Sequence, residues 1–154
     1  MNERPDFVSD DETVYRFISS PSGYNEVTGL SADCFKLFRD NESYISVERS
    51  AYCSLEEAMS NGDYIKKWFA EGESFCGTAL LSVARVRRHP QLEVISKYAE
   101  NYPGHAGIQM LLSDGVVYKF KRNSPTPMQI LALQTYLVSI VEQVLMKSFC
   151  SESA

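Results

Sequence analysis

The sequence lacks the short motifs that most often reveal an enzyme or a metal site. Its four cysteines are widely scattered, and none belongs to a Cys-x-x-Cys or Cys/His doublet of the kind that binds zinc. No Gly-x-Gly-x-x-Gly, phosphate loop, His-Glu-x-x-His or Gly-x-Ser-x-Gly is present. The common nucleotide-binding and hydrolase interpretations therefore lose their best evidence, and no metal ligand set is expected.

A secretory leader and a membrane-spanning run are also missing. Residues 1–12 are acidic and too polar for a signal peptide, so we expect them to form a disordered tail. Residues 128–149 are largely apolar, but five polar residues that are costly at a membrane centre interrupt them: Gln129, Gln134, Glu142, Gln143 and Lys147. We expect a cytoplasmic protein with reduced thiols and no membrane segment.

The length and composition are those of an ordinary globular protein. At 154 residues, with 44% apolar and 23% charged residues, the chain fits one domain over 13–150 that needs no disulfide or metal to fold. The net charge of −5 argues against general nucleic-acid binding, which depends on clustered cations at phosphates.

The hydrophobic pattern predicts an α+β domain with a largely antiparallel sheet of about five strands. We expect strands over 13–18, 44–49, 76–86 and 92–96, followed by a hairpin. In that hairpin, Ser113-Asp114-Gly115 joins an apolar strand before it to another after it. Asp-Gly between apolar runs predicts a type I′ turn, and we place this hairpin in the sheet core.

Two helices complete the expected fold. Ser54 and Glu57 form a capping box that opens a central helix reaching residue 71, with a break at Asn61-Gly62. Thr126 as N-cap and Pro127 at the first helical position open a long C-terminal helix through residue 145. This helix is apolar around much of its circumference, so we expect it to pack across the sheet and consider that it also forms a homodimer seam.

Arg16 is the most informative single residue. It shares a face of the first strand with Val14 and Ile18, which we expect to be covered, so the cation needs a partner. One interpretation is a structural ion pair with Glu48 or Glu93. The other is an anion clamp, because a planar guanidinium holds carboxylate or phosphate through two hydrogen bonds.

His105, one of two histidines, lies where a loop enters a strand. Its side chain has an ordinary pKa near neutrality, as a catalytic acid or base requires. Small neighbours, Gly104, Ala106 and Gly107, leave room beside the ring for a ligand or for close strand packing. A structural histidine bonded to backbone is the alternative to a site residue.

A polar cleft results if the strands bring these residues to one side. We take His105 and Glu48 as candidate catalytic residues, and a second group as candidate ligand-binding residues: Tyr15, Arg16, Ser46 and Gln109. Burying such a group without a ligand would be costly, which is the reason for treating it as a site.

With these residues placed, the chain resembles a loose group of small uncharacterised bacterial proteins. The resemblance covers residues 13–112 and is carried by Tyr15-Arg16, Ser46-Val47 and the His-Ala-x-Ile motif that begins at His105. It implies no settled activity.

The chain is also similar to ADP-ribosyltransferase-like folds, which place an arginine or histidine on the first strand and a serine or tyrosine on a later one. That similarity implies that Arg16 holds a phosphate of NAD and that Ser46 braces the nicotinamide side. The pattern also requires a late catalytic glutamate, and none stands out on the hairpin.

Two function classes follow. In the first, the domain binds a small anionic ligand, NAD or a related nucleotide, around Arg16, Ser46 and His105, with His105 as general acid or base. In the second, it is a non-enzymatic interaction protein, an immunity or accessory component of a bacterial toxin or defence system. In that class, the polar residues only stabilise the core.

Overall fold

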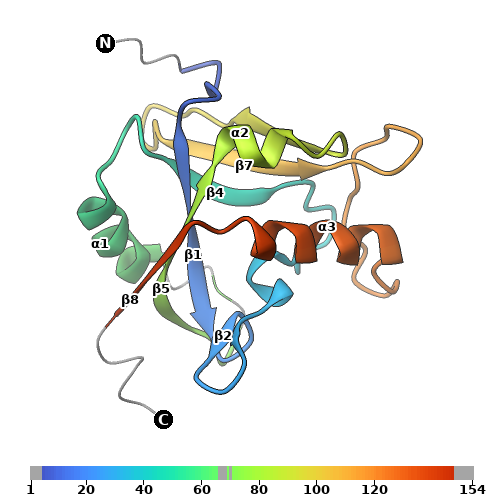
Figure 1. The fold of residues 1–154 in the computed structure, drawn as a ribbon, viewed down its shortest axis with the longest axis horizontal. Coiled ribbons are helices and arrows are strands. Elements are labelled where there is room, and N and C mark those ends of the chain that lie inside the picture. The colour runs from blue at the N-terminus through green and yellow to red at the C-terminus, as the bar shows by residue number, and fades with distance from the viewer. Residues whose placement is uncertain (1–4, 66–68, 70, 148–154) are drawn as a thin grey trace.

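The structure is a computed structural model that describes residues 5–65, 69 and 71–147. It contains a six-stranded, wholly antiparallel sheet in the order β6-β7-β4-β1-β5-β8 (Figure 1). These strands are β1 (Thr13–Ser20), β4 (Ile45–Arg49), β5 (Ser74–Ser82), β6 (Leu92–Ser96), β7 (His105–Met110) and β8 (Gln143–Met146).

The remaining elements are helical, apart from one small hairpin. The helices are α1 (Leu55–Ile65), α2 (Val83–Arg87), α3 (Met128–Ser139) and the 3₁₀ turn η1 (Ala32–Phe35); β2 (Tyr24–Asn25) and β3 (Gly29–Leu30) form the hairpin. The α+β class with a largely antiparallel sheet is therefore confirmed. None of the helices in the described part of the chain has the length and apolar character needed to cross a bilayer.

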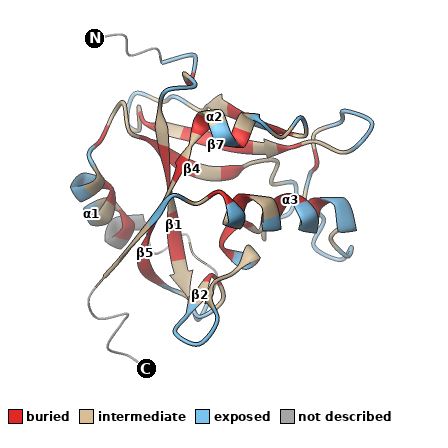
Figure 2. Cartoon of the chain, viewed as in Figure 1, coloured by how far each residue is buried: buried red, intermediate tan, exposed pale blue. Residues whose placement is uncertain are grey.

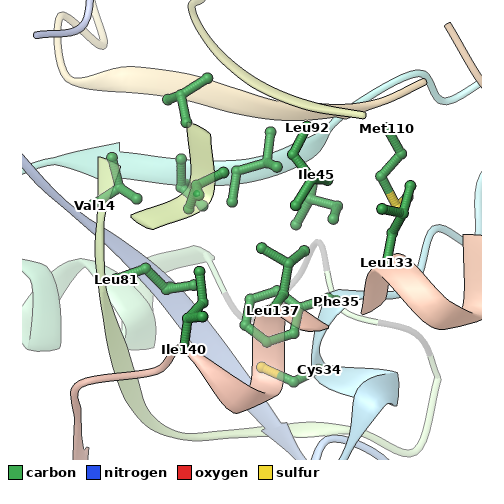
Figure 3. Close-up of a cluster of buried hydrophobic side chains, with 14 of the residues drawn as sticks. Val14, Cys34, Phe35, Ile45, Leu81, Leu92, Met110, Leu133, Leu137 and Ile140 are labelled. Atoms are coloured by element: carbon green, nitrogen blue, oxygen red, sulfur yellow. The ribbon is translucent and has the colours of Figure 1, made fainter. Parts of the chain in front are cut away.

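The larger core lies on one face of the sheet, under α3 and η1. Val14 of β1, Ile45 of β4 and Leu81 of β5 meet Leu133 and Leu137 of α3 there (Figure 3). Buried residues concentrate on the strands and on the sheet-facing side of α3, whose outer side is exposed (Figure 2). Alternation along β1 explains this arrangement, because every second side chain points into the same core.

A smaller cluster occupies the opposite face of the sheet. Tyr15 and Phe17 of β1 pack there with Phe75 of β5 and Ala58 of α1. The two clusters together cover both faces of β1, as expected for a strand that is apolar on both sides.

The capping box of α1 forms as expected. Ser54 N donates to Glu57 Oε1 at 2.9 Å, and Glu57 N donates to Ser54 Oγ at 3.1 Å. The expected break at Asn61-Gly62 is wrong, because α1 runs through both residues. A Cβ at Gly62 would lie 2.1 Å from Cζ of Phe75, so this glycine lets the helix lie against β5. Residues 66–68 and 70 of the expected helix lie outside the described residues.

The strand expected over 76–86 ends four residues early. Ser82 closes β5, and its Oγ accepts from Arg85 N at 3.3 Å, which caps the short helix α2. A serine N-cap at this point offers the backbone an alternative to the ladder.

The prediction of a long C-terminal helix is also wrong. α3 has 12 residues and ends at Ser139, and the next apolar segment forms the strand β8 along β5. Thr126 and Pro127 are shifted by one position relative to expectation, since Pro127 is the N-cap and makes no side-chain cap bond. Periodicity alone does not separate a buried helix from a buried strand, and here pairing with β5 decides the outcome.

The expected hairpin after β7 forms only in its first half. β7 pairs with β4 and β6, whereas residues 116–120 make one isolated bridge, Leu111↔Val117, and then run beside Glu42. Gly115 has φ +86, but Asp114 does not share a positive φ, so the turn is not type I′. Asp114 instead accepts from Val116 N at 3.0 Å, an Asx-type contact.

Residues 5–12, expected as part of a disordered tail, make buried contacts. Val8 is 1% exposed, and the Glu12 carboxylate meets Arg49, which is 0% exposed. Arg49 Nε donates to Glu12 Oε1 at 2.9 Å, Nη2 donates to Glu12 Oε2 at 2.8 Å, and Nη2 also donates to Phe7 O. The acidic segment thus supplies the counterion of a buried cation.

Candidate functional site

A cavity opens where β1 and β4 part. On one edge, β1 pairs with β5 from Thr13 to Ser20. On its other edge, it pairs with β4 over two residue pairs among the described residues, Val14↔Arg49 and Tyr15↔Glu48. Residues 45–48 of β4 pair with β7 on their other side. Beside this split lies a cavity of about 540 Å³, lined by residues of β1, β4, the 36–44 segment and the start of β7.

Arg16 bridges the two parted strands. Its Nε donates to Cys34 O at 2.8 Å and its Nη1 donates to Ser46 O at 2.9 Å, so two backbone carbonyls fix the guanidinium. These bonds replace ladder bonds that β1 and β4 do not make beyond Tyr15. Burial lowers the pKa of Arg16, and the Cys34 and Glu42 groups oppose that shift. An arginine remains charged at neutral pH, so the guanidinium is a cation in the cavity wall.

The structural ion pair considered for Arg16 is not present. Among the described residues, Arg16 makes no salt bridge, and both carboxylates considered for it have other partners. Glu48 accepts from Asn61 Nδ2 at 3.3 Å, and Glu93 accepts from Arg87 Nε at 2.6 Å.

Ser46 and His105 meet in the wall of the same cavity. Ser46 Oγ and His105 Nε2 lie 3.3 Å apart. The ring of Tyr102 stacks on the imidazole at 5.0 Å between centroids, and Tyr44 packs edge-on at 5.8 Å. Burial, with a smaller contribution from Lys97, lowers the pKa of His105 below its usual value. The imidazole is therefore neutral at pH 7, with one ring nitrogen available as an acceptor.

Gly107 serves close packing next to this pair. A Cβ at Gly107 would lie 2.5 Å from Cδ2 of Tyr44, so the absence of a side chain lets the tyrosine ring cross β7. Gly107 is the register partner of Ser46, which places the Tyr44 ring beside the Ser46–His105 contact. Of the two explanations considered for the small residues around His105, strand packing accounts for this one.

The expected polar residues do not all share one face. Tyr15 pairs with Glu48, and Glu48 pairs with His105, so these side chains lie on the face opposite to Arg16. Arg16 and His105 still reach one cavity because the split between β1 and β4 opens the sheet at this point. Ser46 lies on the His105 face, and its backbone carbonyl is what Arg16 contacts.

Three expected site residues lie outside the cavity lining. Glu48 is 4% exposed, and burial raises the pKa of its carboxyl, with hydrogen bonds from Asn61 and Cys53 opposing the shift. Tyr15 is 6% exposed, and its hydroxyl lies 3.5 Å from Cys53 O. Gln109 faces Glu93 across the β6–β7 pair.

The sequence did not point to the 36–44 segment, which supplies much of the wall. It contributes apolar and aromatic side chains, among them Leu37, Phe38 and Tyr44. Glu42 Oε1 accepts from Phe38 N at 3.0 Å and Arg39 N at 3.2 Å, and Asn41 has φ +66, so local bonds fix this turn. The run Arg39-Asp40-Asn41-Glu42 between apolar segments is the available signal for that turn.

Comparison with protein-family models, with curated proteins and with solved structures finds no match to this chain. Within residues 5–65, 69 and 71–147, no group of three or more His, Cys, Asp or Glu side chains is placed to hold a metal ion. Functional inference therefore depends on the cavity itself.

Proposed function

We propose that the protein binds a small anionic ligand in the cavity between β1 and β4, with the anionic group of the ligand on Arg16. The observation that carries the proposal is a cation held by two carbonyls, without a carboxylate partner among the described residues, in the wall of a largely apolar cavity. A buried or half-buried charge in apolar surroundings is costly unless it is paired, and a bound anion supplies the missing partner.

The donor geometry of Arg16 favours this role. A guanidinium carries five N–H groups in a fixed fork, and two are used by Cys34 O and Ser46 O. The remaining donors, on Nη1 and Nη2, have no acceptor among the described residues. A fork that two carbonyls already orient loses little entropy when it binds an anion.

A catalytic extension of the proposal uses His105 on NAD or a related nucleotide. Support comes from the neutral imidazole, its contact with Ser46 Oγ at 3.3 Å and its shared cavity with Arg16. In that extension Arg16 holds a phosphate and His105 exchanges a proton with the ligand.

The test is a thermal-shift screen of wild type and Arg16→Met against NAD, nucleotides, sugar phosphates and organic acids. A ligand at 100 times its Kd stabilises by about 2.7 kcal/mol, which raises the midpoint by several degrees. Arg88→Met is the matched control, because Arg88 is exposed and does not line the cavity. Shifts in wild type and Arg88→Met that vanish in Arg16→Met support the proposal, and equal shifts in all three contradict it.

The interaction-protein alternative, including a homodimer through α3, stays a prediction with a different test. α3 has no charged residue, and its exposed side carries Met128, 80% exposed, and Leu131, 42% exposed. Leu137, by contrast, is 0% exposed in the core and is not available to a partner. Leu131→Glu should therefore lower the mass measured by light scattering if α3 forms a dimer, and an unchanged mass removes that seam.

A further inference from the structure

The proposed ligand site has a charge pattern that narrows the ligand class. Resting on the proposed binding of an anion at Arg16, and not on its extension to NAD, we infer that the natural ligand is an aromatic monocarboxylate: a flat apolar ring system with one carboxylate, and not a phosphate monoester. The charge that the cavity offers, the number of its donors and the composition of its wall each point to this class.

The lining of the cavity carries little net charge. Its cationic side chains are Arg16, Lys36 and Arg39, and its carboxylates are Asp40 and Glu42. The surplus is one positive charge, which matches a monoanion. A phosphate monoester with two negative charges would add uncompensated charge beside Glu42, and like charges in partly buried surroundings repel strongly.

The hydrogen-bond donors around the Arg16 guanidinium suit a planar carboxylate group. A guanidinium presents N–H groups of Nη1 and Nη2 along one edge, an arrangement that pairs with the two oxygens of a carboxylate. Two further polar side chains of the lining, Ser46 and His105, bond each other at 3.3 Å, so they offer fewer free donors to a phosphate. A phosphate presents three terminal oxygens, and those left without a donor would lose their hydration at a cost.

The rest of the wall favours a ring system. Phe17, Phe38, Tyr44 and Tyr102 line the cavity, and the neutral imidazole of His105 stacks with Tyr102. Aromatic side chains bind flat rings through stacking and edge contacts, and pockets of several hundred Å³ hold ligands of two or three fused rings. A small carboxylate such as acetate would fill a minor part of about 540 Å³.

Isothermal titration calorimetry with four probes tests this inference: 2-naphthoate, 2-naphthamide, 2-naphthyl phosphate and acetate. We expect 2-naphthoate to bind at least ~10-fold more tightly than the neutral amide and the phosphate, and at least ~100-fold more tightly than acetate. Ten-fold corresponds to about 1.4 kcal/mol, a modest share of a charge-assisted contact. Arg16→Met should abolish the preference for 2-naphthoate over the amide.

Arg16→Lys is a second variant, for the case that Arg16→Met does not fold. It keeps the positive charge but lacks the planar guanidinium donors. We expect it to keep part of the preference over the amide, while Arg88→Met keeps all of it. AMP and NAD provide the second arm of the experiment. If they or 2-naphthyl phosphate bind through Arg16 more tightly than 2-naphthoate, the ligand class is wrong and the proposed function stands. If no anion of either class binds wild type, the proposed function itself is overturned.

Discussion

Removing the charge of Glu12 should destabilise the protein far more than its place in an acidic N-terminal segment suggests. Arg49 is 0% exposed, and Glu12 meets it through two hydrogen bonds at 2.9 and 2.8 Å. Glu12→Gln removes the carboxylate charge that faces a buried guanidinium, and breaking a buried pair in this way costs about 3–5 kcal/mol. Because total stabilities are of order 5–15 kcal/mol, such a loss is large enough to unfold a substantial fraction of the protein.

Equilibrium urea unfolding of wild type, Glu12→Gln and Asp11→Asn measures the effect. Asp11 is the matched control because it is adjacent, acidic and exposed, so its change should stay within about 0.5 kcal/mol of wild type. The double variant Glu12→Gln with Arg49→Met should recover much of the loss, since an apolar side chain needs no counterion. The pair should also persist in high salt, because buried charges are weakly screened.

Equal urea midpoints for Glu12→Gln and Asp11→Asn would contradict this prediction. That result would mean that Arg49 is satisfied without Glu12 and that residues 5–12 contribute little to the fold.

Three further changes test other contacts. Gly62→Ala should cost about 1–3 kcal/mol in unfolding free energy, since its Cβ would lie 2.1 Å from Phe75; an unchanged midpoint would show that α1 does not pack as described. Burial raises the native pKa of Glu48, so its contribution to stability is present below its unfolded pKa and is lost as pH rises through the native value. Glu48→Gln should therefore be neutral or stabilising at pH 7 and gain nothing at pH 4, and marked destabilisation at pH 7 would contradict this. Burial and Lys97 lower the native pKa of His105, so its contribution is present above its unfolded pKa of about 6.5 and is lost as pH falls. His105→Gln should flatten that acid-side decline in urea titrations, and an unaltered pH profile would rule His105 out as its cause.

Local chemistry made part of the fold predictable. The alternation along β1 and β4, the β-rich run that forms β6 and the Ser54–Glu57 capping box each depend on residues close in sequence. In these segments the local conformational propensity agrees with the tertiary environment, so the local sequence is enough to predict the structure.

The C-terminal errors have a non-local cause. The apolar run that ends in β8 suits a buried helix and a buried strand equally well, and the open edge of β5 selects the strand. The segment after Gly115 keeps a backbone bond from Tyr118 N to Met110 O and then diverges from β7, where Phe120 N donates to Glu42 O. Neither partner is visible from the local pattern.

Three of the six expected site residues lie together at the cavity, whereas Tyr15, Glu48 and Gln109 do not line it, and the shape of the cavity was not predictable. Arg16, Ser46 and His105 were expected near one another, and all three line the cavity. Their arrangement depends on the parting of β1 from β4 and on the pairing of β4 with β7. Strand order of this kind involves contacts between segments dozens of residues apart, such as the Ser46↔Gly107 pair.

The proposed function requires that the guanidinium of Arg16 bind an anion in the cavity. The most direct measurement is a titration of arginine-labelled protein with 2-naphthoate, followed by NMR of the side-chain Nε–H signals and assigned with the Arg16→Met variant. We expect the Arg16 signal to move in a saturable way, while the signals of Arg85, Arg87 and Arg88 stay in place. A titration in which those three arginines move and Arg16 does not would contradict this expectation.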